Sequence, residues 1–332
     1  MEVGSTSPLS IQVVSDGRIG MENQALGLAE ALQRLSPSAT VSIRRVKWRK
    51  AFDRLPSALK APWMLDPSSD PVFPAPGEPW PDVWIATGRA TLPLSLMAKR
   101  RSGGRTFVVQ TQDPRWRTAD FDLVVAPRHD GIEGPNVLSI TGSPHRVTPE
   151  RLAEGAPAFA ERLDPLPRPR VAVLIGGRSR AHDLPEAQAA ELAERIGAAV
   201  EAAGGSLMLT FSRRTPAPAK AAMTARLSRL PGWIWDGTGA NPYFAFLHHA
   251  DHVLVTEDSA NMAAEAASTG KPVHILPMVP VKKADKFARL HADLQQQGAA
   301  RPFAGRLEGW DYKPLAETGR AAREILERMA RR

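Results

Sequence analysis

Residues 253–276 read VLVTEDSANMAAEAASTGKPVHIL, and the rest of the chain is organised around this stretch. It predicts a buried strand at Val253–Val255, a polar turn over 256–261, a helix of small residues at Met262–Ala267 and a second strand at Pro272–Leu276. A strand, a turn and a helix N-terminus in this order direct backbone N–H groups and the positive end of the helix dipole at one place. Such a place favours an anion.

Polar side chains in this stretch are candidates for ligand contacts. Ser259 and Asn261 stand at the start of the predicted helix, and Glu265 follows inside it. The carboxylate of Glu265 can accept a hydrogen bond from a ribose hydroxyl. The structural alternative is that Asp258 or Ser259 caps the helix and that Glu265 is a solvated charge.

Composition restricts the class of protein. The chain has 332 residues, of which 43% are hydrophobic and 23% charged, and it has no cysteine. This length favours two domains, and no apolar run reaches the ~20 residues of a membrane span. The absence of cysteine excludes disulfides, thiolate metal sites and cysteine nucleophiles. Together with a start, MEVGSTSPLS, that lacks a secretory signal pattern, it predicts a cytoplasmic location.

The net charge of +8 favours anionic partners. The basic residues are spread along the chain and no nucleic-acid-binding signature occurs, so we expect no nucleic acid partner. One basic and aromatic segment, 46–65, suits peripheral contact with an anionic membrane surface. The alternative there is an ordinary basic loop with buried tryptophans. The proposed membrane contacts are Lys47, Trp48, Arg49, Lys50 and Trp63.

Strand and helix patterns alternate along both halves of the chain, which predicts an α/β fold of two doubly wound, Rossmann-like domains. Three prolines within 164–170 favour a linker. The predicted organisation is an N-terminal α/β acceptor-side domain at 1–163, the linker, a second α/β domain at 171–310 and a C-terminal helix within 311–332. Further strands are predicted at Ile11–Val14, Val41–Arg45, Val83–Ala86, Thr106–Gln110, Leu123–Ala126, Val137–Ile140, Val171–Ile175, Ser206–Phe211 and Trp233–Trp235, and further helices at Met21–Leu35, Thr91–Arg100, Pro185–Ala203, Pro216–Leu230, a short one through His249, Ala284–Gln297 and Leu315–Arg331.

Three loops of the second half, at 176–179, 212–215 and 256–261, follow predicted strands and should meet at one edge of its sheet. In the first loop two glycines allow backbone N–H groups to approach a phosphate. In the second, adjacent arginines suit a diphosphate. The candidate phosphate-binding residues are Gly176, Gly177, Arg178, Ser179, Ser212, Arg213, Arg214, Ser259 and Asn261.

A further turn, at 237–243, lies between the second and third of these loops. Its Asn241 and Tyr243 are candidates for a nucleobase pocket. A proline turn that caps a helix is the alternative at this place.

The loops of the first half carry candidates for the acid and base chemistry. Asp16, in a glycine-flexed loop after the first strand, is a candidate catalytic base. The neighbours His129 and Asp130, directly after an apolar strand, are a candidate acid/base pair, although such a dipeptide also occurs in purely structural roles. No HxH or HExxH pattern occurs, and we infer metal-independent chemistry. The remaining acceptor-side candidates are Gly17, Arg18, Asn23, Gln24, Gln112 and Asp113.

As a set, these motifs resemble the mitochondrial-fission Elm-type family, whose bacterial members are described as glycosyltransferases. The segments that carry the resemblance are SDGRIGMENQALGLAEAL, PRHDG, LIGGRSR, TFSRRTP, GANPY and TEDSANMAAEA, and they cover most of the chain from Ser15 to about Leu276. The resemblance implies a GT-B-like arrangement of two facing domains, with a nucleotide-sugar donor on the C-terminal domain and a last helix that crosses back to the first.

A more distant similarity is to the cell-wall N-acetylglucosaminyltransferase of the GT-B class. That similarity implies that Glu265 matches a ribose-binding glutamate. Glu257 and Asp258 depart from its pattern, because such enzymes usually have Arg or small residues there, and two acids weaken diphosphate binding unless nearby arginines offset them.

We therefore predict a metal-independent glycosyltransferase that needs no cofactor. It moves a sugar from a nucleoside-diphosphate sugar to a lipid-linked or cell-envelope saccharide acceptor. The alternatives are another nucleoside-diphosphate-sugar enzyme, an epimerase or hydrolase, and a non-catalytic membrane-associated scaffold with a transferase fold.

Overall fold

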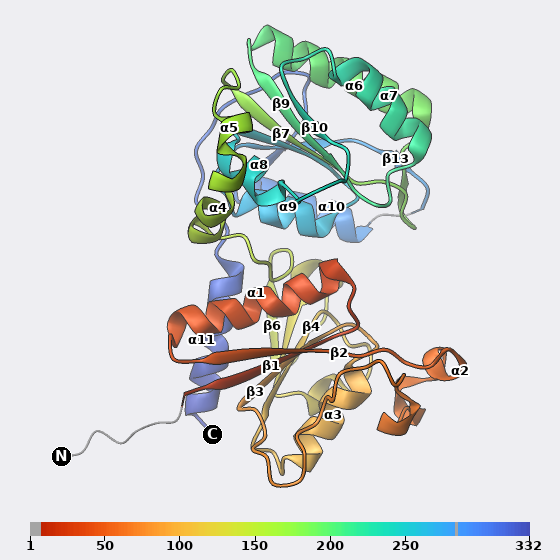
Figure 1. The fold of residues 1–332 in the computed structure, drawn as a ribbon, viewed down its shortest axis with the longest axis vertical. Coiled ribbons are helices and arrows are strands. Elements are labelled where there is room, and N and C mark those ends of the chain that lie inside the picture. Colours follow the sequence, from red (N-terminus) through yellow and green to blue (C-terminus); the bar gives the residue numbers. More distant parts are fainter. Residues whose placement is uncertain (1–7, 283–284) are drawn as a thin grey trace, which may run out of the picture. The chain divides into compact units, whose positions relative to one another are not determined.

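The computed structural model describes residues 8–282 and 285–332, which form two compact units. Unit 1 consists of the described residues up to Arg146 together with Ala316–Arg332, and unit 2 is Val147–Leu315. Each unit contains a six-stranded parallel sheet with helices on both faces (Figure 1). The predicted class of two doubly wound α/β domains is confirmed.

Unit 1 is built on a sheet whose strands bury alternate side chains on its two faces. Helices α1 (Ile19–Leu35) and α11 (Glu317–Ala330) cover one face, and α3 (Leu92–Arg101) covers the other. In α1 the apolar side chains recur every three or four residues, so one stripe of the helix is buried. The strands are β1 (Ser10–Ser15), β2 (Thr40–Arg45), β3 (Val83–Thr87), β4 (Phe107–Thr111), β5 (Leu123–Pro127) and β6 (Val137–Ile140), in the order β2-β1-β3-β4-β5-β6.

Unit 2 has the strand order of a dinucleotide-binding fold. Its sheet runs β10-β9-β7-β11-β12-β14, so the order reverses between β7 and β11. Loops at the carboxyl ends of those two strands border the crevice in which such sheets bind ligands. The strands are β7 (Arg170–Ile175), β9 (Ser206–Phe211), β10 (Gly232–Trp235), β11 (His252–Thr256), β12 (Val273–Leu276) and β14 (Ala300–Pro302), and a separate two-stranded ribbon pairs β8 (His182–Asp183) with β13 (Val279–Pro280).

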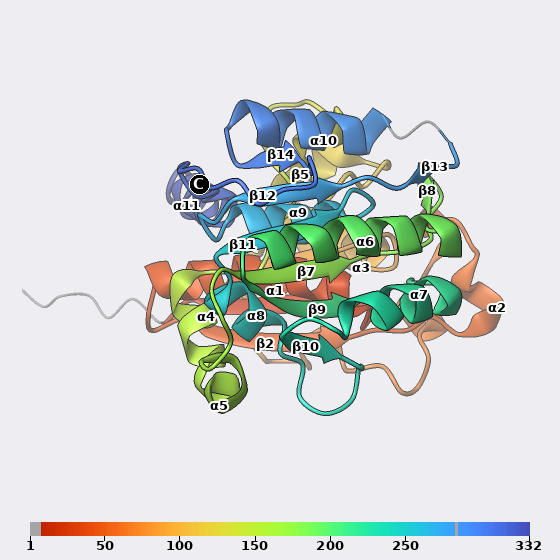
Figure 2. The same cartoon turned by 90° about the horizontal axis from the view of Figure 1, so that it is seen from above.

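Helices cover both faces of the unit 2 sheet. Helices α6 (Glu186–Ala202) and α7 (Ala217–Leu227) lie side by side on one face (Figure 2). Helices α8 (Tyr243–His249), α9 (Ala260–Ala267) and α10 (Asp285–Gln296) lie on the other.

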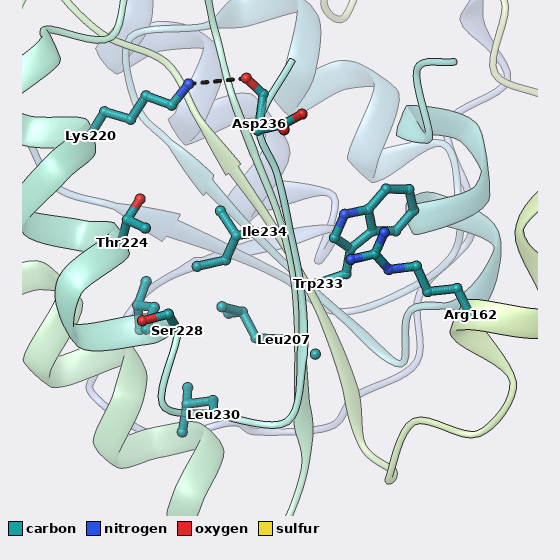
Figure 3. Close-up of a pocket in the computed structure, with 11 residues that line it drawn as sticks. Arg162, Leu207, Lys220, Thr224, Ser228, Leu230, Trp233, Ile234 and Asp236 are labelled. Atoms are coloured by element: carbon teal, nitrogen blue, oxygen red, sulfur yellow. Dashed lines mark hydrogen bonds between the residues drawn. The ribbon is translucent and has the colours of Figure 1, made fainter. Parts of the chain in front are cut away.

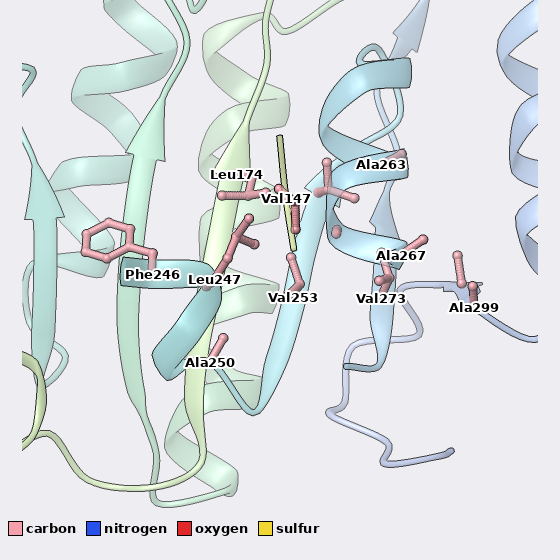
Figure 4. Packing of buried hydrophobic residues seen from close by; sticks show 14 of the residues in the cluster. Val147, Leu174, Phe246, Leu247, Ala250, Val253, Ala263, Ala267, Val273 and Ala299 are labelled. Carbon is pink, nitrogen blue, oxygen red and sulfur yellow. The ribbon is translucent and has the colours of Figure 1, made fainter. Parts of the chain in front are cut away.

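Small side chains bring α9 close to its sheet. Ala263 and Ala267 of α9 are fully buried against β11 and β12, and Phe246 and Leu247 of α8 belong to the same buried cluster on this face (Figure 4). Burying a side chain the size of Phe246 contributes about 1.5–3 kcal/mol. This packing fixes α9, and so fixes the polar residues that α9 carries.

The predicted linker at 164–170 lies inside unit 2, and the boundary between the units falls at 146/147 instead. The prolines stop the preceding helix, but the segment then folds along the sheet edge, where the Pro169 carbonyl accepts the Ser206 N–H at 3.0 Å. Leu163 just before it is fully buried in the core of unit 2. Two short helices were missed here, α4 (Pro149–Gly155) and α5 (Ala160–Leu163).

Helix α2 (Lys50–Asp53) was also not predicted, and the bounds of the predicted elements differ from the observed ones by at most three residues. The short strands β8, β13 and β14 were missed, because two or three residues are too few to show a pattern. The predicted first residue of α10, Ala284, and the first seven residues of the chain lie outside the described residues.

Candidate functional site

The three predicted loops of unit 2 meet at the carboxyl edge of its sheet. The N–H of Gly177, after β7, donates to Oδ2 of Asp258, after β11, at 3.0 Å. The N–H of Arg178 donates to the carbonyl of Arg214, after β9, at 3.0 Å. These contacts join segments about 40 and 80 residues apart in the sequence, as the parallel strands require.

Asp258 holds this edge together. Its side chain is 0% exposed, and it accepts hydrogen bonds from the Gly177 N–H and, at 2.7 Å, from the Thr256 hydroxyl. The Arg214 guanidinium forms an ion pair with it, also at 2.7 Å. A buried carboxylate is stable only when it is paired and hydrogen-bonded in this way. The acid that the sequence comparison marked as a departure is therefore the centre of the loop cluster.

The two glycines serve this loop packing. A Cβ added at Gly176 would lie 1.9 Å from Oδ1 of Asp258, and one at Gly177 would lie 2.2 Å from the Arg214 carbonyl oxygen. The Gly176 N–H donates to Oγ1 of Thr256 at 2.7 Å, so both glycine N–H groups are bonded within the protein. The expectation that these N–H groups face a phosphate is corrected: they bind the neighbouring loop instead. Ser179 likewise uses its hydroxyl oxygen within its own loop, where it accepts the His182 N–H at 2.9 Å.

The three predicted arginines differ in what they bind. Arg178 pairs with Asp183 at 3.1 Å while its side chain stays 72% exposed, and Arg214 pairs with Asp258. Arg213 is exposed, and within residues 8–282 and 285–332 it forms no ion pair. Ser212, before it, accepts the Arg214 N–H at 3.1 Å. Arg213 is thus open to an anion at this edge.

Two predicted donor residues, Ser259 and Asn261, lie at the start of helix α9. Ser259 is its N-cap and accepts the Met262 N–H at 3.3 Å, so the capping alternative holds for this serine. Asn261 lies in the first turn and is half-buried. The N-cap of α8 is Pro242, and Asn241, just before it, accepts the Tyr243 N–H at 3.0 Å.

Glu265 and Tyr243, predicted separately, bind each other. The Tyr243 hydroxyl donates to Oε2 of Glu265 at 2.5 Å. Burial raises the pKa of Glu265 to about 7, although the tyrosine hydrogen bond opposes that shift. Burial, and next the charge of Glu265, raise the pKa of Tyr243, so the phenol keeps its proton and remains the donor. The solvated-charge alternative for Glu265 is therefore excluded.

In unit 1 the candidate base is paired with its neighbour. Asp16 accepts from Nε of Arg18 at 2.8 Å, and Gly17 between them adopts a positive φ of 77°. Asp16 raises the pKa of the Arg18 guanidinium by this hydrogen bond. The loop follows β1, at the point where the order of the unit 1 sheet reverses between β1 and β3.

The acceptor-side glutamines also form a contact. Nε2 of Gln112, a residue with a left-handed φ of 66°, donates to Oε1 of Gln24 at 2.9 Å. Non-glycine residues in that conformation are strained, and such strain is concentrated at functional sites. Asp113 accepts the N–H of Arg115 at 2.8 Å, and Asn23 is half-buried on α1.

His129 and Asp130 form a short helical turn after β5 with Arg128, and His129 is 9% exposed. Strands β3 and β4 lie between β1 and β5, which separates this turn from Asp16 by about 14 Å along the sheet edge. Asp16 and His129 are therefore alternative bases and do not form one catalytic pair.

Sequence reasoning missed two partners at these sites. Thr256, the last residue of β11, connects Gly176 to Asp258, and Glu22 forms a two-point ion pair with Arg45 at 2.9 Å. That arginine lowers the pKa of Glu22. The sequence did hold a signal for Thr256: the acid Asp258 follows it by two residues, at the end of the same strand.

Two general features were also searched. Among the residues that the structure describes, no three His, Asp or Glu side chains come together to hold a metal ion, and no helix is long and apolar enough to cross a membrane. A cavity of about 290 Å³ lies between α7 and β10, where the Lys220 ammonium donates to the Asp236 carbonyl at 3.3 Å (Figure 3). None of the predicted donor residues lines it.

The basic segment at 46–65 is partly buried. Trp48 is 4% exposed, and its indole N–H donates to the Ala90 carbonyl at 2.9 Å, so the predicted membrane contact is wrong for this residue. Trp63 is 63% exposed and stacks edge-on with Phe52. The other predicted contacts, Lys47, Arg49 and Lys50, are exposed.

The family model described as mitochondrial fission ELM1 matches residues 19–329. The chain belongs to the mitochondrial fission ELM1 family. It is 32% identical over 283 residues to the mitochondrial fission protein ELM1 of Arabidopsis thaliana, and the match covers 76% of this chain but only 65% of the plant protein. To the uncharacterized protein RP120 of Rickettsia prowazekii it is 24% identical, with 96% of this chain and 98% of that protein covered.

Solved structures share the fold of this ELM1-family chain at low identity. The UDP-GlcNAc 2-epimerase of Methanocaldococcus jannaschii has a TM-score of 0.56 and 13% identity, covering 96% of this chain and 99% of the other. The UDP-GlcNAc 2-epimerase of Neisseria meningitidis, solved with bound UDP-GlcNAc, has a TM-score of 0.53 and 12% identity. The match covers 98% of this chain and 100% of the other. At such identity the likeness establishes the fold of nucleotide-sugar enzymes, which is the GT-B-like fold.

Proposed function

We propose that this chain is a glycosyltransferase that moves a sugar from a nucleoside-diphosphate sugar to a lipid-linked or cell-envelope saccharide acceptor. The observation that carries the proposal is the loop cluster around Asp258, which sets Arg213 and the start of α9 at the switch point of the unit 2 sheet. Ligands of such sheets bind at this point. The family membership and the shared fold agree with it.

Each donor residue has a part in this proposal. Arg213 binds the diphosphate directly, because its guanidinium forms no ion pair within the described part of the chain. Arg178 and Arg214 are exposed enough to exchange their carboxylate partners for a phosphate oxygen, at a cost in affinity. Glu265 accepts a ribose hydroxyl. A leaving nucleoside diphosphate that is neutralised by arginines needs no metal ion, so we propose metal-independent transfer.

Asp16 is the proposed base that removes the proton from the acceptor hydroxyl. It lies at the switch point of the unit 1 sheet, and its side chain remains 14% exposed beside Arg18. His129 is the weaker candidate, because its side chain is buried. Gln24, Gln112 and the backbone around Gly17 would position the acceptor hydroxyl.

The second candidate is another reaction on the same donor, an epimerisation or a hydrolysis. It is favoured by two solved structures that share the fold at a TM-score above 0.5 and are UDP-GlcNAc 2-epimerases. Product analysis separates the two candidates. Conversion of the nucleotide sugar in the absence of any acceptor supports the second, whereas turnover that requires an acceptor supports transfer.

The test of the donor site is a thermal-shift screen with UDP-, GDP-, ADP-, CMP- and dTDP-sugars in the presence of EDTA. A ligand at 100 times its dissociation constant should stabilise the chain by about 2.7 kcal/mol. Arg213→Ala should lose the shift. Arg229→Ala is the matched control, since this exposed arginine precedes β10 at the opposite edge of the same sheet. No shift with any nucleotide sugar would favour the non-catalytic scaffold.

A lipid-linked acceptor would require contact with a membrane surface, and we propose the exposed part of the segment at 46–65 for it. Trp63 and Leu59 are 63% and 62% exposed, close in sequence to the exposed Arg49 and Lys50. Trp63→Ser should reduce co-sedimentation with vesicles containing phosphatidylglycerol, and vesicles of phosphatidylcholine alone should bind neither protein. Equal binding of the wild type and the variant would contradict the assignment.

A further inference from the structure

The contact between Tyr243 and Glu265 limits what the proposed ribose site can bind. Tyr243 is the first residue of α8, and Glu265 lies in the middle of α9. The phenolic O–H donates to Oε2 of Glu265 at 2.5 Å. Both helices are fixed on the sheet by buried side chains, Phe246 and Leu247 on α8 and Ala263 on α9, so the two groups are held in this position.

Only one oxygen of Glu265 is left without a partner. Within residues 8–282 and 285–332, Oε1 of Glu265 forms no hydrogen bond, whereas Oε2 is used by Tyr243. A ribose offers two adjacent hydroxyls, the 2′-OH and the 3′-OH, and a carboxylate binds both when it presents one free oxygen to each. With Tyr243 in place, the second hydroxyl would have to share Oε2 with the phenolic O–H, which already takes one of its two lone pairs.

We propose that Tyr243 restricts Glu265 to a single ribose hydroxyl, so that the donor site accepts 2′-deoxyribonucleoside diphosphates almost as well as ribonucleoside diphosphates. The 3′-OH is present in both sugars and satisfies Oε1 alone. The inference rests on the proposed function, because it takes Glu265 as the ribose contact. Tyr243 is then a specificity-determining residue that acts through Glu265.

The burial of the pair supports a persistent contact. Because burial raises the pKa of Tyr243, its hydroxyl stays protonated at neutral pH and keeps donating to Glu265. A ribose 2′-OH that displaced it would leave a half-buried phenol without its partner, and polar groups that lose a partner where water is restricted are costly.

The experiment is isothermal titration of the full chain with four nucleotide pairs, UDP and dUDP, ADP and dADP, GDP and dGDP, and CDP and dCDP. For the base that binds, we expect the dissociation constants of the ribo and deoxy forms to agree within about threefold. In Tyr243→Phe both oxygens of Glu265 become free, so the preference for the ribonucleotide should rise to about tenfold, the effect of one hydrogen bond to a charged group.

Two results would overturn the inference while the donor site stands. One is a wild-type preference of tenfold or more for the ribonucleotide, and the other is an unchanged ratio in a folded Tyr243→Phe protein. Absence of binding by every nucleotide would overturn the proposed function, and the inference with it. Should Tyr243→Phe fail to fold, Glu265→Gln provides the second test: it should weaken both members of a pair by the same factor, and an unequal loss contradicts a single shared hydroxyl.

Discussion

Replacing Asp258 by asparagine should separate its two effects, on the stability of the loop cluster and on anion binding. Asparagine has the same shape, and its amide oxygen can accept from the Gly177 N–H while its NH₂ donates to Thr256. The Gly177 N–H keeps its acceptor, whereas the Thr256 hydroxyl, whose oxygen already accepts the Gly176 N–H, must turn its proton to another acceptor. What disappears is the negative charge that holds Arg214.

The magnitude follows from the contacts that change. A hydrogen bond to a charged group contributes about 1.5–3 kcal/mol and a neutral one about 0.5–1.5 kcal/mol, so Asp258→Asn should lower the free energy of unfolding by about 1 kcal/mol. In a unit of this size that corresponds to a fall in Tm of about 2–4 °C. The side chain of Arg214, 43% exposed, becomes free for a phosphate. After allowance for solvent screening, that gain is about 1 kcal/mol, or about fivefold tighter binding of a nucleoside diphosphate.

Scanning calorimetry and titration with UDP, or with the nucleotide found in the screen, measure the two effects. Asp258→Ala is the comparison, because it strands the Gly177 N–H and should cost about 2–4 kcal/mol. An unchanged Tm in Asp258→Asn would show that the charge does not hold the cluster. Weaker nucleotide binding in a stable Asp258→Asn protein would refute the idea that Asp258 competes with the ligand for Arg214.

Three further outcomes are expected. Burial raises the pKa of Glu265 to about 7, so the folded state holds this proton more tightly than the unfolded chain, and the free energy of unfolding should fall as the pH rises from about 4.5 to about 7. Glu265→Gln should remove up to about 3 kcal/mol of this pH dependence in urea unfolding. If the free energies of unfolding of the wild type and the variant change in parallel with pH, the assignment is contradicted. Gly177→Ala places a Cβ 2.2 Å from the Arg214 carbonyl and should destabilise by about 3 kcal/mol, whereas Gly309→Ala, with open space around it, should stay within about 0.5 kcal/mol in the same denaturation assay. Trp48→Ala should cost about 3–5 kcal/mol in thermal unfolding without changing vesicle binding, and lost vesicle binding by the folded variant would mean that this tryptophan reaches lipid.

The sheets were predictable because their signal is local. A run such as Val171–Ile175 is apolar throughout, and a strand buried on both faces leaves that mark on the sequence. The boundary between the units could not be predicted in this way, because it depends on contacts between distant segments. Prolines at 164–170 look like a linker, yet this segment leads directly into β7. Nothing within those seven residues shows that Leu163 and Ser206 will anchor them.

The candidate site also combines features that the local sequence predicts with features that depend on contacts between distant segments. That loops 176–179, 212–215 and 256–261 meet follows from strand ends alone, and this much was predicted. Which group each N–H binds does not follow, because the partner of Gly177 is Asp258, far along the chain, and only the assembled sheet brings the two together. The pattern of two glycines before an arginine is the same whether the loop binds a phosphate or an internal carboxylate.

Asp258 also explains how a site with three arginines can be folded before an anion arrives. Without a ligand, cations gathered at one edge repel each other, and internal acids at Asp183 and Asp258 remove that cost for Arg178 and Arg214. The same acids then compete with the ligand, so the diphosphate affinity depends mainly on Arg213. Because a buried carboxylate without its guanidinium is costly, Arg214 can turn to a phosphate only if the donor N–H and hydroxyl groups of Gly177 and Thr256 continue to satisfy Asp258. Those two short contacts therefore decide whether this edge of the sheet can release an arginine to its substrate.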